Sequence, residues 1–278
     1  MSLSSLPPNV HLVLAPNPSL MTGPGTNSYV VVGEGAPCAV IDPGPDEMAH
    51  LEALARVAEA HGGIGAILVT HGHADHDAGA SRLRAMTGAP VYAWSRAGVA
   101  SADCPLADGD TVPVGARTLR ALHTTGHRFD HLCFLLEDAG ALFAGDLVAG
   151  VGTVVIVPPE GDLADYLASL DRLLALPDLR TILPGHGPTI ADGPALLREY
   201  VAHRLQREQQ VLAGVAAGQT MVAELVAGIY ADVDPALHSW AGRTVTAHLL
   251  KLEREGRVTR PERAPDDGPW HLAPAAGA

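Results

Sequence analysis

The sequence is poor in aromatic residues and in positive charge. Aromatic residues make up 4% of the 278 residues, and Lys251 is the only lysine beside seventeen arginines. The formal net charge is −13, which argues against a protein whose main role is to coat nucleic acid. Hydrophobic residues make up 47% and charged residues 18%, so we expect a sizeable core and no extensive disorder.

Features that mark other compartments are also missing. No Lys or Arg precedes Arg56, whereas a secretory signal or a mitochondrial presequence needs basic residues. No apolar run reaches about 18 residues, the length that spans a membrane. The three cysteines, Cys38, Cys104 and Cys133, form neither a disulfide framework nor a zinc-ligand spacing. We therefore expect a cytoplasmic protein with reduced, buried cysteines and no membrane contact.

Strand and helix patterns alternate through the first 190 residues. Short apolar runs bounded by Gly, Pro or Asp predict strands, and the clearest of them are residues 28–32, 38–42, 65–70, 131–137 and 141–146. The amphipathic pattern of residues 162–176 predicts a helix. Two mixed sheets of the α/β class with helices outside would accommodate this order.

The pattern changes after about Ala191. Three helices are expected there, at residues 194–215, 220–233 and 243–256. Two short apolar segments, 257–260 and 269–273, flank a polar turn and suggest a small hairpin. Three helices and a hairpin are the layout of a winged helix. We therefore expect two domains, residues 1–190 and residues 191–278.

The densest group of titratable side chains directly follows a predicted apolar strand. The stretch HGHADH holds His71, His73, Asp75 and His76. In an extended segment alternate side chains share a side, so the first two histidines can reach one ion. A catalytic metal needs several imidazoles or carboxylates that converge on one point. Four candidate ligands in six residues therefore predict a metal site.

Other strand ends supply further candidate ligands. Asp42, His127, Asp146 and His186 each follow an apolar strand and have Gly or Pro beside them or close by. In layered α/β folds the loops at strand ends are where ligands gather. We therefore expect these side chains to join the HGHADH loop at one edge of the sheets.

The ordered motifs HxHxDH, Gly126-His127, Gly145-Asp146 and Gly185-His186-Gly187 resemble the ligand set of the metallo-β-lactamase superfamily. The resemblance covers nearly the whole chain and implies an αββα sandwich. The segments GPGTNSYVV, HRLQREQQVL and VTAHLLKLEREGRV are similar to the beta-lactamase-like protein 2 subgroup of mitochondrial endoribonucleases. That subgroup carries a C-terminal winged helix, as expected here.

The resemblance implies a role for each candidate ligand. Two zinc ions are expected, and the second site can also accept manganese or iron. A hydroxide shared by the two ions would be the nucleophile, and Asp75 would hold its proton. Asp42 would accept a hydrogen bond from a ligand imidazole and fix its tautomer. The implied ligands are His71, His73 and His127 for the first metal, Asp75, His76 and His186 for the second, and Asp146 for both.

Two further residues are candidates for substrate contact. The strand-end motif around Gly126 reads TTGHR, with Arg128 where a threonine is common in the superfamily. This arginine can bind an anion in the pocket, or it can be an ordinary surface residue. His131, four residues after His127, is the second candidate for the pocket lining.

Three functions remain open at this point. The resemblance places a hydrolase of single-stranded RNA first. The alternatives are a hydrolase of a small ester, thioester or lactone and, with the weakest support, a nucleic-acid-binding regulator with a structural metal site. Arg243, Lys251 and Arg254 share one face of the last helix and form a basic stripe that could bind phosphates. A winged helix in this position can also form a wall over the site or a contact between copies of the chain.

Overall fold

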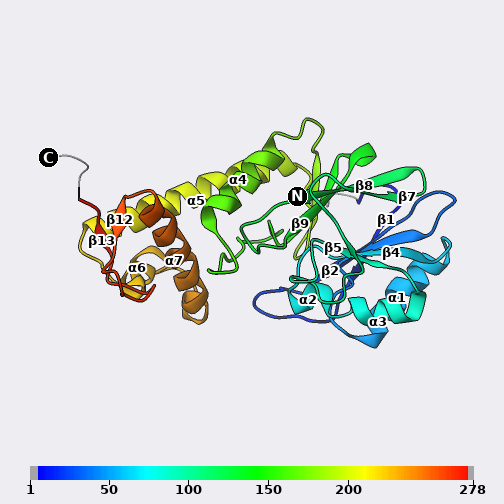
Figure 1. The fold of residues 1–278 in the computed structure, drawn as a ribbon, viewed down its shortest axis with the longest axis horizontal. Coiled ribbons are helices and arrows are strands. Elements are labelled where there is room, and N and C mark those ends of the chain that lie inside the picture. Colours follow the sequence, from blue (N-terminus) through cyan, green and yellow to red (C-terminus); the bar gives the residue numbers. More distant parts are fainter. Residues whose placement is uncertain (1–5, 275–278) are drawn as a thin grey trace.

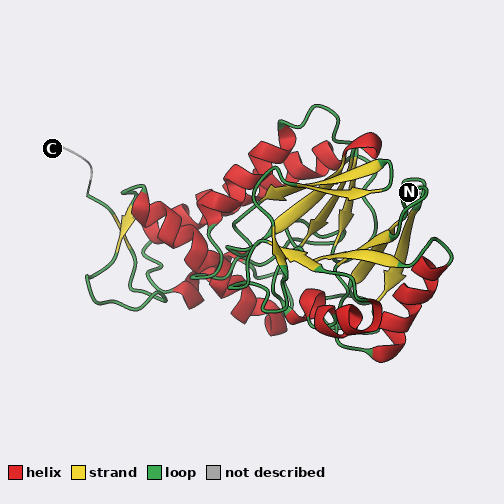
Figure 2. Ribbon diagram, turned by 45° about the vertical axis from the view of Figure 1, so that its right-hand side comes forward, coloured by secondary structure: helices red, strands yellow, loops and turns green. Residues whose placement is uncertain are grey.

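Two β-sheets face each other and form the inner layers of the structure, a computed structural model that describes residues 6–274 (Figure 2). The first sheet has the order β1-β2-β3-β4-β5-β6, with β1 (Val10–Leu14), β2 (Asn27–Val31), β3 (Cys38–Ile41), β4 (Ile64–Leu68), β5 (Val91–Ala93) and β6 (Cys104–Pro105). The second has the order β11-β10-β9-β8-β7, with β7 (Thr111–Val114), β8 (Arg117–His123), β9 (Leu132–Leu136), β10 (Ala141–Gly145) and β11 (Thr181–Pro184). A 3₁₀ turn, η1 (Glu137–Ala139), joins β9 to β10.

Alternation along the strands divides the core into layers. In β9, Phe134 faces the other sheet, whereas its neighbours Cys133 and Leu135 face the helices outside, as the two-residue period of a strand requires. Tyr29 of the first sheet and Phe143 of the second meet edge to face, with ring centroids 5.2 Å apart. The expected two-sheet sandwich is confirmed.

Helices cover the outer face of each sheet. α1 (Met48–Glu59), α2 (Ala74–Asp77) and α3 (Ala80–Thr87) follow strands of the first sheet, and α4 (Leu163–Leu174) packs on the second. Asp162 caps α4, because its carboxylate accepts hydrogen bonds from the backbone N–H groups of Ala164 and Asp165. The order of layers is therefore helix, sheet, sheet, helix.

The C-terminal part forms a smaller core of its own (Figure 1). Its elements are α5 (Gly193–Ala216), α6 (Val222–Ile229), η2 (Pro235–Leu237), α7 (His238–Arg254), β12 (Val258–Thr259) and β13 (His271–Leu272). The last two strands pair antiparallel as the expected hairpin. α5 contributes to both cores, because Leu197 and Tyr200 pack on the sandwich whereas Val211 and Val215 pack with α6 and α7.

None of the helices within residues 6–274 combines the length and the apolar character that a bilayer crossing requires.

Candidate metal centre

Five strands end at the same edge of the sandwich and bring the candidate ligands together. β3, β4, β8, β10 and β11 are followed by Asp42, His71, His127, Asp146 and His186, respectively. Two groups of donor atoms form there, each within 4.8 Å: one from His71, His73, His127 and Asp146, and one from Asp75, His76 and His186.

The first group is built from three imidazole nitrogens. Nδ1 of His73 lies 2.9 Å from Nε2 of His71 and 3.2 Å from Nε2 of His127. In a tetrahedral zinc site with Zn–N distances of about 2.0–2.1 Å, ligand nitrogens lie roughly 3.3 Å apart. The three nitrogens are therefore spaced as the ligands of one metal ion are.

Hydrogen bonds on the far side of two of these rings fix their tautomers. The Thr70 hydroxyl donates to Oδ2 of Asp42, so its oxygen accepts a proton from Nδ1 of His71, 3.0 Å away. Nδ1 of His127 donates to the carbonyl oxygen of Val155, at 3.0 Å. Both rings therefore turn an unprotonated Nε2 toward His73.

The second group combines two imidazoles with a carboxylate. Oδ2 of Asp75 lies 3.2 Å from Nε2 of His186 and 3.6 Å from Nε2 of His76. His76 is fully buried, and its Nδ1 lies 2.8 Å from Oδ2 of Asp42. Its Nε2 is buried without a hydrogen-bond partner among the described residues. A buried nitrogen without a partner is costly, and a bound cation would satisfy it.

Asp146 lies between the two groups. Its Oδ1 is 3.4 Å from Nε2 of His76 and 3.3 Å from Nε2 of His186, and its Oδ2 is 3.9 Å from Nε2 of His127. The backbone N–H of Asp146 donates to Nε2 of His131. One carboxylate oxygen therefore faces each group, as a residue that bridges two ions requires.

The protonation of the two groups differs. Burial and the neighbouring His127 lower the pKa of His73 to about 4, and burial holds the pKa of His71 well below its usual value. Burial acts in the same direction on His186, but its hydrogen bonds with Asp146 and Asp75 outweigh that effect and raise its pKa to about 9. The histidines of the first group are thus neutral donors, whereas the second group retains protons until a cation displaces them.

These donors fit divalent metal ions. In the first group, a proton on Nδ1 of His73 could form a hydrogen bond with Nε2 of His71 or of His127, but not with both. A bound cation would instead accept the lone pairs of all three nitrogens. A site of three histidine nitrogens suits zinc, and the mixed second site suits zinc, manganese or iron.

Arg128 and His131, the two candidates for substrate contact, are both buried close to the ligand groups. Arg128 is 9% exposed and pairs with Asp130 at 2.7 Å and with Glu160 at 2.6 Å. Its charge is therefore already neutralised. His131 is fully buried, and its ring nitrogens face the Thr124 hydroxyl and the backbone N–H of Asp146.

Several residues that support the site were not identified from the sequence. Asp130, 1% exposed, accepts the backbone N–H of Gly72 in the ligand loop at 2.9 Å. The side-chain amide of Asn27 donates to the carbonyls of Pro184 and Gly187, on either side of His186. Asn27 lies in the GTNSY segment, but a lone polar residue carries no signal of a partner about 160 positions away.

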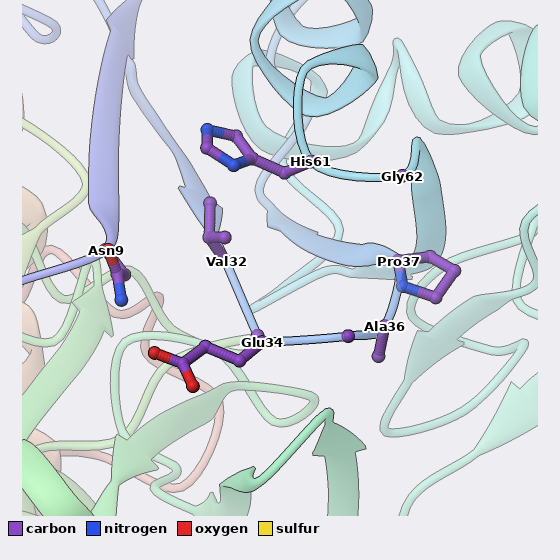
Figure 3. Close-up of a pocket in the computed structure, with 9 residues that line it drawn as sticks. Asn9, Val32, Glu34, Ala36, Pro37, His61 and Gly62 are labelled. Atoms are coloured by element: carbon purple, nitrogen blue, oxygen red, sulfur yellow. The ribbon is translucent and has the colours of Figure 1, made fainter.

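A separate surface hollow of about 510 Å³ lies between the end of β2 and the end of α1. Figure 3 shows His61 and Glu34 on opposite sides of it. No residue of either ligand group is among its lining residues, so this hollow is separate from the candidate metal centre.

Residues 21–186 match the family described as the metallo-beta-lactamase superfamily, and residues 222–270 match the beta-lactamase associated winged helix domain. The second match confirms the winged helix expected from the sequence.

Three relatives illustrate the range of similar proteins. Lactamase-like protein adaB of Aspergillus niger is 36% identical over 88% of this chain and 80% of its own length. The Beta-lactamase-like protein 2 homolog of Drosophila melanogaster is 32% identical over 92% of both. An atrochrysone carboxyl ACP thioesterase of Aspergillus chevalieri is 37% identical over 75% of this chain and 66% of its own length.

Two solved structures share the fold. A beta-lactamase domain protein from Burkholderia ambifaria is 22% identical and covers 97% of this chain and 93% of its own, with a TM-score of 0.81. TTHA1623, in a di-iron-bound form, is 29% identical and covers 67% of this chain and 96% of its own, with a TM-score of 0.53.

Proposed function

The chain belongs to the metallo-beta-lactamase superfamily and is a metal-dependent hydrolase; from this premise we propose that it cleaves a small thioester or ester with an apolar acyl group. Residues 1–190 would form the catalytic domain, and residues 191–278 the winged-helix domain. One observation carries this choice of substrate: two of the three cations of the basic stripe, Lys251 and Arg254, are already paired with carboxylates.

The basic stripe of the last helix illustrates this pairing. Lys251 contacts Glu208 at 2.8 Å and Glu255 at 2.6 Å, and Arg254 contacts Asp162 at 2.6 Å. These ion pairs join α7 to α5 and to the start of α4. Only Arg243 of the stripe has no ion pair among the described residues, where it lies over the Trp240 ring. A phosphate backbone would have to break the other pairs before it could bind.

Apolar side chains, in contrast, are exposed on segments that adjoin the ligands. Leu20 is 75% exposed and Met21 46% exposed, in the loop whose Gly25 carbonyl contacts Nδ1 of His186. Val151 is 75% exposed and follows Gly150, whose N–H donates to the carbonyl of His186. Exposed apolar groups beside a catalytic site favour an apolar substrate.

The residues of the site would divide the chemistry among them. Two divalent ions, when bound, supply an ionised water at neutral pH and polarise the carbonyl under attack. His71, His73, His127 and Asp146 would hold the first ion, and Asp75, His76, His186 and Asp146 the second. The spacing of the donor atoms supports this division.

Asp75 is the residue we assign to hold the proton of the nucleophile. Its side chain is 29% exposed, whereas that of His76 is fully buried, so Asp75 can reach both the ions and an incoming substrate. Burial opposes ionisation, but hydrogen bonding with His186 and the charge of His76 hold the pKa of Asp75 below its usual value. The carboxylate is therefore ionised when it binds a metal.

The thioester is supported by a relative's name. A protein 37% identical to this chain is named as an acyl carrier protein thioesterase, and both a thioester and an ester present the carbonyl that this site is suited to polarise.

Cleavage of single-stranded RNA is the second candidate. It is supported by the resemblance to the beta-lactamase-like protein 2 subgroup, and a homolog of that name matches over 92% of both chains. A nucleic-acid-binding regulator with a structural metal is the least supported, because structural sites are closed sets of four ligands, whereas seven donors lie around these two groups.

The test is a substrate comparison with metal-loaded protein. We expect turnover of acyl thioesters, with kcat/KM rising by up to about fourfold per added methylene, and loss of turnover in Asp75→Ala. Single-stranded RNA should show little salt-dependent binding, and Arg243→Gln should not change it. Metal-dependent cleavage of RNA that is lost in Asp75→Ala, with thioester turnover at background, would overturn the proposal.

A further inference from the structure

One carbonyl oxygen outside the ligand groups controls the orientation of a candidate ligand. Val155 accepts the Nδ1 proton of His127, which leaves Nε2 free to face His73 and Asp146. A partner on the far nitrogen fixes both the tautomer and the ring plane of a ligating histidine. The position of Val155 therefore matters to the first metal site.

The segment that carries this carbonyl has no regular structure of its own. Residues 147–157 lie between β10 and α4 and contain neither helix nor strand. Without a ladder of internal hydrogen bonds, such a segment needs partners elsewhere to hold one conformation.

Those partners come from the helices of the C-terminal part. Arg204 of α5 donates from its guanidinium to the carbonyl of Val154, the residue before Val155. The Tyr200 hydroxyl, one turn earlier on α5, accepts the N–H of Ala149 at 3.0 Å and lies 2.9 Å from the carbonyl of Gly152. On α7, the hydroxyl of Thr244 lies 3.5 Å from the N–H of Ile156.

Among the side chains that contact this segment, Arg204 carries a buried charge. The residue is 2% exposed, and its guanidinium lies 5.2 Å from the centre of the Tyr166 ring. Its Nε has no hydrogen-bond partner among the described residues. Burying a charge is costly unless it is paired or hydrogen-bonded. The hydrogen bond to the Val154 carbonyl links this buried charge to the loop of the metal site.

We propose that Tyr200 and Arg204 are positioning residues for His127: they hold residues 149–154 so that the Val155 carbonyl meets Nδ1 of the ring. Through α5 the winged-helix part thereby contributes to the first metal site without touching the metal. This inference rests on the proposed ligand role of His127.

The decisive comparison uses two arginines on the same helix. Arg204→Met removes the donor to the loop. Arg207→Met is the matched control, because Arg207 donates to the carbonyl of Ile229 in the C-terminal part at 3.1 Å and not to the loop. Arg204→Lys restores a charged donor of similar length.

Metal affinity is measured by competition with a chelator, and the Nδ1 proton of His127 is followed by nitrogen-edited NMR in metal-free protein. We expect Arg204→Met to weaken the first metal site about 10- to 100-fold and to broaden or lose the His127 signal. Arg204→Lys should recover most of both, and Arg207→Met should change neither. Wild-type affinity and an unchanged signal in folded Arg204→Met would overturn the inference.

Two further variants separate the possible failures. If Arg204→Met does not fold, Tyr200→Phe removes a single hydroxyl of α5 that contacts the same segment. We expect this variant to weaken the same site and alter the same signal to a smaller degree. Unchanged affinity and signal in that variant would equally overturn the inference. If His127→Ala itself leaves metal affinity unchanged, the proposed metal site is wrong. If only His127→Ala weakens metal binding, the ligand role of His127 is supported and the positioning role of Tyr200 and Arg204 is wrong.

Discussion

Oδ2 of Asp42 lies 2.8 Å from Nδ1 of His76, with both side chains almost completely buried. The same oxygen accepts the hydroxyl of Thr70, and the other oxygen accepts the Thr70 N–H. Thr70 in turn contacts Nδ1 of His71. One carboxylate therefore orients a histidine in each ligand group.

Asp42→Asn should weaken both metal sites and the second one most. Asp42 has a φ of +50°, a conformation that Asn tolerates, so the backbone can stay in place while the charged acceptor is lost. We expect chelator competition to show a loss of about 10- to 100-fold at the second site. Asp192→Asn is a control, because Asn also caps a helix and Asp192 caps α5 away from the ligands. Unchanged affinity in Asp42→Asn would contradict the orienting role.

The sequence predicted the strand-end ligands because they combine a dense local motif with an apolar strand before each loop. The residues that support these ligands could not be predicted in this way, because their partners are far away in the sequence. Asp130 reaches Gly72 across 58 positions, and Glu160 pairs with Arg128 across 32. Neither contact follows a helical or strand period. The acceptor for His127 is a backbone carbonyl, which no residue type reveals.

The sequence pattern also did not predict the local geometry of the ligand loop. Residues 74–77 form a short helix, and the donor atoms of Asp75 and His76 join the second group, whereas those of His71 and His73 join the first. The strands β6 and β7 were not expected, because each contains a proline, which argues against a strand, and β6 is only two residues long.

Metal binding to the second group should depend on pH more steeply than binding to the first. A ligand imidazole must be neutral, so a raised pKa makes protons compete with the metal. The pKa of His186 is raised to about 9, whereas that of His73 is lowered to about 4. Release of the His186 proton alone should therefore raise affinity at the second site by up to tenfold per pH unit from pH 6 to about 9, and affinity at the first site should stay nearly constant. Chelator competition at several pH values measures both, and parallel profiles would contradict the assignment.

Asp75→Ala should abolish turnover while the fold survives. The change removes a metal ligand and the proton holder together, and loss of a proton-transfer group alone costs about 10²- to 10⁴-fold in rate. Asp77→Ala is the matched control, since Asp77 lies two residues further in the same short helix and belongs to neither ligand group. It should retain most activity and bind metal normally. Equal loss in both variants would mean that the loop has merely been disturbed.

His248→Leu should stabilise the protein in acid. His248 is fully buried and neither ring nitrogen has a hydrogen-bond partner among the described residues. Burial and the charges of Arg204 and Lys251 lower its pKa to about 3. Because the unfolded chain binds the proton near pH 6.5, this residue costs stability as pH falls from about 6.5 to 3. Urea titrations should show a flatter pH dependence in the variant, and an unchanged profile would contradict this.

Leu20→Ser combined with Val151→Ser tests the substrate class. Both side chains are 75% exposed on segments that adjoin His186, and neither lies in a ligand group. If they cover the acyl group of the substrate, the double variant should raise KM for a long-chain thioester about tenfold, because burial of each apolar side chain is worth roughly 1.5–3 kcal/mol when complete. A short acetyl thioester should be affected far less, and metal affinity should not change.

Leu272→Ser provides the control for this substrate prediction, since Leu272 is 47% exposed in the C-terminal hairpin. It removes an exposed apolar group of the same kind away from the ligand loops, so KM should stay at the wild-type value. An unchanged KM for the long-chain thioester in the double variant, or an equal rise for the acetyl thioester, would contradict a contact between these side chains and the acyl group. The paired cations of α7 would then have to be reconsidered as a phosphate site that opens when RNA binds, and the salt dependence of RNA binding would decide between the two substrates.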